Sequence, residues 1–157
     1  MQRMNYSAVG AEAFGAMLKV EGALGKCSLD PLLKELVKTR ASQMNGCAFC
    51  LDMHVKTARK YGEREMRLHH VAIWRESNLF NAQERMALEL TEALTYIAPA
   101  GISDELYQRA QAVFSEQELC DLVFLIAMIN AWNRLGATFH TELGSMDKAM
   151  GLDKLEL

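Results

Sequence analysis

The chain has 157 residues, of which half are apolar and about a quarter are charged, and its formal net charge is −3. This balance is typical of a soluble globular protein, so we expect one domain over residues 1–157. The slight acidic excess argues against a nucleic-acid-binding surface. The longest apolar run, Leu122–Ile129, is much shorter than the roughly 20 residues of a membrane span. Residues 1–5 also lack the apolar stretch of a signal peptide, so we expect a cytoplasmic protein with no membrane partner.

Helical periodicity extends along the whole chain, and strand-like alternation never persists. Asp30 supplies an N-cap before a first-turn proline, Asn45-Gly46 breaks the pattern, and Asn81 and Ser115 each begin a capping box. The sequence therefore predicts an all-α fold. The expected helices cover about 8–24, 31–45, 47–62, 63–76, 81–97, a short segment that begins at 103, and 115–142, with at most one further turn in the tail.

The last and longest of these helices is apolar on nearly every side between Leu122 and Ile129. Such a helix must be surrounded, and a small domain does this with difficulty, so we expect a subunit interface to complete its cover. Polar residues that follow this run need partners if they are buried. We expect Asn130, Asn133 and Arg134 to pair across helices or subunits, or to line the thiol pocket.

Two of the four cysteines, Cys47 and Cys50, have a spacing with chemical meaning, and His54 follows the second by four residues. On a helix these three side chains share one face. Cys27 lies in an expected loop, and Cys120 is expected to be a small core residue. The charged residues expected on the opposite, water-facing side of the same helix are Asp52, Lys56, Arg59 and Lys60.

Disulfide redox chemistry needs at least a pair of thiols and a nearby proton acceptor. The unpaired N–H groups at the start of a helix favour a thiolate there. His54 lies one turn from Cys50 but two turns, about 10 Å, from Cys47. We therefore expect His54 to deprotonate Cys50, and Cys47 to resolve the resulting sulfenic acid into a disulfide. Thioredoxin-like sites use the opposite order, and their motif follows a strand.

Other interpretations of the same residues stay open. Two thiolates and one imidazole could hold zinc, although three ligands on two turns of one helix give poor tetrahedral geometry. His54 could also be an ordinary core histidine beside an inert cysteine pair. Our expectation is a redox site without a metal or cofactor.

The segment Glu35–His54 resembles the core of alkylhydroperoxidase D-like proteins, which belong to the carboxymuconolactone decarboxylase superfamily. Ile129–Leu135 resembles a recurrent element of a peroxidase-related branch, and the overall resemblance extends from about Tyr6 to His140. It implies an all-helical fold that assembles into homo-oligomers, either trimers or hexamers. It also implies that hydroperoxides are reduced through the cysteine pair.

Carried onto this chain, the resemblance makes Cys50 the attacking thiol, Cys47 the resolving thiol, and His54 with Glu35 the proton relay. The role of Glu35 is assigned from the resemblance alone. It lies off the apolar stripe of its helix, so periodicity predicts a surface carboxylate. Phe49 stands where alkylhydroperoxidase D can carry a histidine, which removes one proton-handling group. The superfamily's decarboxylases lack the cysteine pair, which argues against lactone decarboxylation here.

The sequence thus predicts a thiol-dependent, peroxidase-like oxidoreductase with an antioxidant role, a Cys47/Cys50 redox-active disulfide and a hydroperoxide substrate. The resemblance implies a dithiol electron donor of the lipoyl type. The alternatives are a general disulfide reductase or redox sensor without peroxide preference, a non-enzymatic helical assembly protein, and a decarboxylase-type enzyme that does not depend on the thiols.

Overall fold

The computed structural model describes residues 1–155, and every regular element in that range is helical, which confirms the all-α prediction. The elements in chain order are α1 Tyr6–Val9, α2 Ala11–Gly25, α3 Pro31–Asn45, α4 Ala48–Lys60, α5 Glu65–His70, the 3₁₀ turn η1 Val71–Ile73, α6 Ala82–Thr95, α7 Asp104–Gln111, α8 Glu116–Phe139 and α9 Asp147–Met150.

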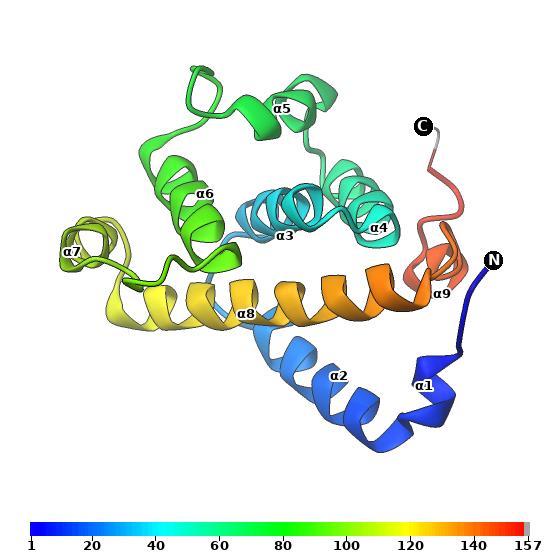
Figure 1. Cartoon of the computed structure of the whole chain (residues 1–157). Coiled ribbons are helices and arrows are strands. Elements are labelled where there is room, and N and C mark those ends of the chain that lie inside the picture. Colours follow the sequence, from blue (N-terminus) through cyan, green and yellow to red (C-terminus); the bar gives the residue numbers. More distant parts are fainter. Residues whose placement is uncertain (156–157) are drawn as a thin grey trace.

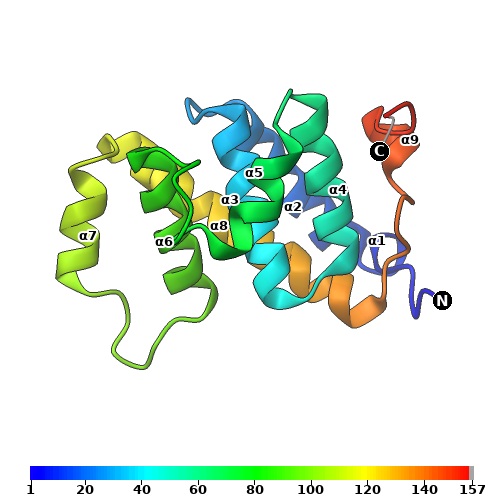
Figure 2. The ribbon, with the colours of Figure 1, turned by 90° about the horizontal axis from the view of Figure 1, so that it is seen from above.

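Helix α3 lies at the centre of the fold. It contacts α4 and α6 on its two sides and crosses α8, which lies between α3 and α2 (Figure 1). Helix α2 covers α8 from the other side, and α7 lies at the opposite end from α9 and both termini (Figure 2). Because α3 is covered on several sides, Leu36, Val37 and Ala41 are fully buried. The ends of α3 and α4 therefore sit on a rigid scaffold.

Local capping explains where these helices begin. The Asp30 carboxylate accepts hydrogen bonds from the N–H groups of Leu32 and Leu33, at 2.9 and 3.0 Å, and Pro31 occupies the first turn. Both expected capping boxes are formed, one at Asn81 and one at Ser115. These starts agree with the sequence prediction because a cap is a local interaction.

Two boundaries differ from the prediction. The expected first helix is divided at Gly10, whose backbone leaves the helical region while its N–H bonds to the Tyr6 carbonyl. The helix expected over 63–76 ends at His70 and continues as the 3₁₀ turn η1. Beyond this turn Trp74 and Arg75 both bind Glu92 of α6, and this tertiary contact replaces further helix.

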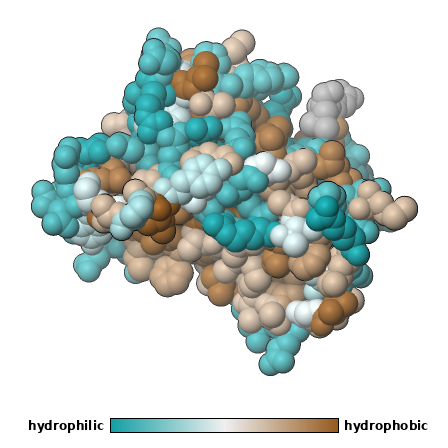
Figure 3. All heavy atoms as spheres, viewed as in Figure 1, coloured by the Kyte–Doolittle hydropathy of each residue, from teal (hydrophilic) through white to brown (hydrophobic). Residues whose placement is uncertain are grey.

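Helix α8 packs against α2, α3, α4 and α6 but keeps one exposed side. It buries Leu122, Leu125 and Ile126 but leaves Val123 and Phe124 exposed, and apolar surface extends along this underside of the molecule (Figure 3). By length and composition α8 could cross a membrane, with a mean hydropathy of 1.3 over an 18-residue window that is 39% buried. The core helix of a soluble protein meets the same criterion, so this property does not identify a membrane protein.

Candidate functional site

The turn between α3 and α4 places the first cysteine. Gly46 ends α3 with a φ of 64°, in the left-handed region that glycine adopts without strain. The Cys47 N–H then donates to the Ser42 carbonyl at 3.1 Å. Cys47 becomes the N-cap of α4, and its sulfur accepts the N–H of Cys50 at 3.3 Å. The Asn-Gly break therefore delivers the thiol pair to the positive end of a helix.

Cys47 and Cys50 form a disulfide, with their Cα atoms 5.4 Å apart. The two sulfurs lie within bonding reach, as their spacing predicted. Both residues are only 1% exposed, because Ala41 and Ile129 pack beneath them and Phe49 and Trp132 lie against the same cluster. In the oxidised protein the sulfurs are therefore enclosed by hydrocarbon.

Gly136 of α8 lets the long helix approach both sulfurs, a feature that the sequence analysis missed. A Cβ atom at this position would lie 2.8 Å from the Cys47 sulfur and 3.2 Å from the Cys50 sulfur. Real Cβ contacts are essentially never as short as the first distance. A glycine inside a long apolar helix was the available signal, since such glycines commonly mark a close packing contact.

His54 lies one turn after Cys50 on α4, and its Nδ1 is 2.8 Å from the Glu35 Oε2 atom. Both residues are buried. An ionised carboxylate only accepts hydrogen bonds, so Nδ1 carries a hydrogen and Nε2 remains as the proton acceptor. Periodicity had made Glu35 a surface carboxylate, which is wrong: α3 is covered on several sides, so positions off its main apolar stripe are also buried.

The outer face of α4 is less exposed than its helical spacing predicted. Lys56 was expected to meet water, but it is buried, with its Nζ 2.8 Å from both Asp52 and Asp147. Hydrogen bonds to Asp147 and Asp52 favour the ammonium form and raise the pKa of Lys56. The expectation fails because the C-terminal segment with α9 folds back over α4, which helical periodicity cannot reveal.

The polar residues of α8 brace the turn that carries the thiols. The Asn45 amide donates to the side-chain oxygens of Asn130 and Asn133, both at 2.9 Å, and Asn133 donates to the Ser42 hydroxyl at 3.0 Å. Arg134 bonds back to the Asn130 carbonyl at 2.8 Å. The expected pairing across helices is confirmed for Asn130 and Asn133, while Arg134 stays within its own helix.

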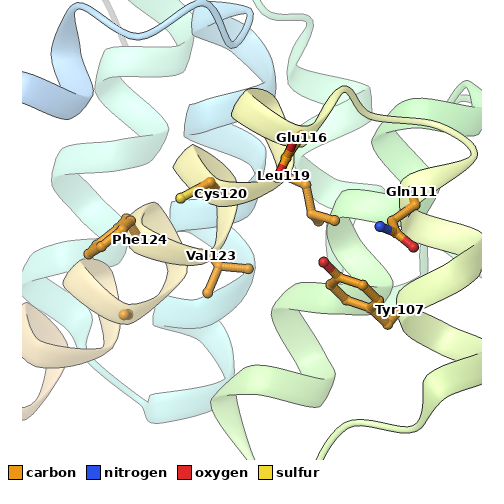
Figure 4. Close-up of a pocket in the computed structure, with 8 residues that line it drawn as sticks. Tyr107, Gln111, Glu116, Leu119, Cys120, Val123 and Phe124 are labelled. Atoms are coloured by element: carbon orange, nitrogen blue, oxygen red, sulfur yellow. The ribbon is translucent and has the colours of Figure 1, made fainter.

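A separate groove of about 440 Å³ lies between α7 and α8 (Figure 4). Cys120, Val123 and Phe124 line it, and Cys120 is exposed, so its expected core position is wrong. Cys120 precedes Gly136 by sixteen residues on one helix, or about 24 Å along its axis. The groove is therefore not the thiol site.

Among residues 1–155, no three His, Cys, Asp or Glu side chains are arranged to hold a metal ion.

Comparison with known proteins identifies the family of this chain. A profile of the carboxymuconolactone decarboxylase family matches residues 11–93, which include both cysteines, His54 and Glu35. The chain belongs to this family. One family relative, YdfG of Bacillus subtilis, has no assigned function and is 41% identical over 92% of this chain and 98% of its own length.

Solved structures of the family share the fold. A protein of unknown function from Agrobacterium tumefaciens, proposed to be an antioxidant defence protein of the AhpD type, is 37% identical over 91% of this chain and 98% of its own, with a TM-score of 0.87. A peroxidase-related protein from Ralstonia eutropha with an alkylhydroperoxidase AhpD core is 17% identical, with a TM-score of 0.78 over 88% of this chain and 74% of its own. This family member therefore has the AhpD-like helical fold, with its cysteine pair at the start of a helix.

Proposed function

We propose that this protein is a thiol peroxidase that reduces hydroperoxides through a Cys47/Cys50 dithiol–disulfide cycle. The observation that carries the proposal is the disulfide at the start of α4, followed one turn later by His54. The Nδ1 atom of His54 is held by the buried carboxylate of Glu35. A helix N-terminus and an adjacent base both favour the thiolate that attacks peroxide. The family's AhpD-type and peroxidase-related members support the same chemistry.

The cycle begins with both cysteines reduced. His54 Nε2 takes the proton of the Cys50 thiol, and the thiolate attacks one peroxide oxygen. The O–O bond breaks, which leaves a sulfenic acid on Cys50 and an alkoxide that takes up a proton as the alcohol. The Cys47 thiol then attacks the sulfenic sulfur, forming the disulfide and releasing water. Glu35 orients His54 and stabilises its protonated form.

An external dithiol, for which we propose a lipoyl-type donor, completes the cycle. It reduces the Cys47–Cys50 disulfide to two thiols and is itself oxidised to a disulfide, so the protein returns to its starting state. The buried sulfurs require the donor to displace part of their cover. Phe49 is only half-buried, so it is the part of the cover that we expect to move.

The direct test is peroxide-dependent oxidation of dihydrolipoamide by the wild-type protein, Cys50→Ser and Cys47→Ser. We expect loss of turnover in both variants, with sulfenic acid trapped on Cys50 in Cys47→Ser. Cys120→Ser serves as the matched control, since this exposed cysteine lies far from the site. Equal rates for the wild type and Cys50→Ser would exclude the proposal. Oxidation of the pair by disulfides as fast as by peroxide would instead indicate a general disulfide reductase.

A further inference from the structure

A line of charged side chains extends from His54 to the surface of α2. Beyond Glu35, Lys38 of α3 lies with its Nζ 3.9 Å from the Glu35 Oε1 atom and 2.6 Å from Glu21 Oε1. The second oxygen of Glu21 accepts the Trp132 indole N–H at 3.3 Å. Trp132 also packs in the apolar cluster with the two cysteines. Helices α2, α3, α4 and α8 thus all contribute to one connected cluster.

Exposure increases steadily along this line. The side chains of His54 and Glu35 are 7% exposed, Lys38 is 12% exposed and Glu21 is 31% exposed. Burial raises the pKa of Glu21, but the charge and hydrogen bond of Lys38, the Trp132 hydrogen bond and the His54 charge together bring it below its ordinary value. Glu21 is therefore ionised at neutral pH and sits at the solvent end of the line.

The charge balance gives Glu21 a specific effect. Glu21, Lys38 and Glu35 together carry two negative charges and one positive charge, a net charge of −1 that a protonated His54 brings to zero. Without Glu21, the Lys38 ammonium would cancel Glu35, and a protonated His54 would leave a buried net positive charge. Uncompensated buried charge is costly, so Glu21 favours proton uptake by His54.

We propose that Glu21 and Lys38 are positioning residues for the thiol site. Lys38 holds Glu35 in place, and Glu21 neutralises Lys38 so that His54 can receive the proton of Cys50. The inference rests on the proposed function, because it assigns His54 as the base for that thiol.

The other groups around His54 and the two cysteines do not duplicate the effect of Glu21 on proton uptake by His54. The residues of α8 that pack against the cysteine pair include Ile129, Trp132 and Gly136, which carry no charge. On the outer face of α4, Lys56 is paired with Asp52 and Asp147. Within residues 1–155, the charged side chains that ion pairs connect to His54 are therefore Glu35, Lys38 and Glu21.

The test is a titration of the His54 imidazole that does not depend on peroxide turnover. In a background of Cys27→Ser, Cys47→Ser and Cys120→Ser, the ring proton resonances of His54 are followed against pH by NMR. Glu21→Gln removes a negative charge, so protonation of His54 becomes less favourable and its titration midpoint should move to lower pH, by about half a unit or more. Lys38→Met removes a positive charge and should move it to higher pH. The double variant should return close to the parent.

Glu12→Gln is the matched control, since Glu12 is an exposed carboxylate in the first turn of the same helix α2, about 13 Å further along it. Loss of packing alone would not give shifts of opposite sign that cancel in the double variant. Shifts of the same sign, or midpoints unchanged in both single variants, would overturn the inference. If Glu21→Gln fails to fold, Glu21→Ala with Lys38→Met gives the same comparison. A failed peroxidase assay with opposite shifts would reject only the proposed reaction.

Discussion

At the scale of single residues, we propose that the contact between His54 and Glu35 decides how well Cys50 is activated. Glu35→Gln keeps the shape of the side chain but removes the charge that stabilises a protonated His54. We expect the rate of peroxide reaction with the reduced protein to fall about tenfold to a hundredfold. Rapid-mixing measurement of Cys50 oxidation checks this. Glu89→Gln, which removes an exposed ion pair with Arg109, should leave the rate unchanged.

Gly136 provides the second prediction at this scale. In Gly136→Ala the new Cβ would collide with the Cys47 sulfur and press against the Cys50 sulfur, so α8 or the thiol turn must shift. We expect a loss of about 1–3 kcal/mol in the free energy of unfolding of the oxidised protein. The loss should be smaller in the reduced protein, where the sulfurs are not fixed by a bond.

Urea denaturation of both redox forms measures these differences. The matched control is Gly22→Ala in α2, where an added Cβ meets no atom within 4 Å. Alanine is the better helix former, so this control should be neutral or slightly stabilising. Equal stability of Gly136→Ala and the wild type in the oxidised state would contradict the close approach.

Sequence reasoning at the residue scale succeeded where the relevant distance runs along one helix. Cys47 and Cys50 lie one turn apart at the start of α4 and form a disulfide, as their spacing predicts. It failed where burial depends on which other elements pack nearby. Lys56 is buried under α9, and Cys120 is exposed on an uncovered side of α8. The apolar pattern of one helix does not show which other elements pack against it.

At the scale of elements, Glu92 of α6 joins three parts of the fold. It accepts the Trp74 indole N–H at 2.9 Å, pairs with Arg40 of α3 at 2.6 Å and also pairs with Arg75. Burial acts to raise the pKa of Glu92, but the hydrogen bonds from Trp74, Arg75 and Arg40 outweigh it and lower the pKa below its ordinary value. The carboxylate therefore stabilises the fold in its ionised form.

This lowered pKa gives a stability prediction with a definite sign. The contribution of Glu92 is present above about pH 4.5, the ordinary value, and is lost as pH falls through the lower folded-state value. Glu92→Gln should reduce the free energy of unfolding by about 1–3 kcal/mol at pH 7. Its difference from the wild type should narrow at acidic pH. Denaturation at a series of pH values checks this, and a difference that widens on acidification would refute it.

The helix starts were predictable and some helix ends were not. Asp30, Asn81 and Ser115 cap their helices through contacts within four residues, so the sequence contains the whole signal. The early end of α5 depends instead on Trp74 and Arg75 reaching Glu92, seventeen or eighteen residues away. Such a long-range contact leaves no mark in a helical pattern.

At the scale of the whole molecule, the exposed apolar side of α8 remains to be covered. Val123 is 39% exposed and Phe124 is 57% exposed, and α2, which contacts α8, exposes Leu18 and Val20. Apolar surface gathered on one side of a small protein commonly marks an interface. The resemblance to alkylhydroperoxidase D-like proteins implies trimers or hexamers, and we propose that this side of α8 forms their interface.

The proposal predicts that Phe124→Glu breaks the assembly, because the interface would then bury an unpaired charge. Light scattering coupled to size exclusion should give a homo-oligomer for the wild type and a smaller species for the variant. Ile73→Glu is the matched control, since Ile73 is 56% exposed on η1, away from α8. A monomeric wild type would remove the proposed interface. A variant that keeps the wild-type mass would show that the interface does not include this side of α8.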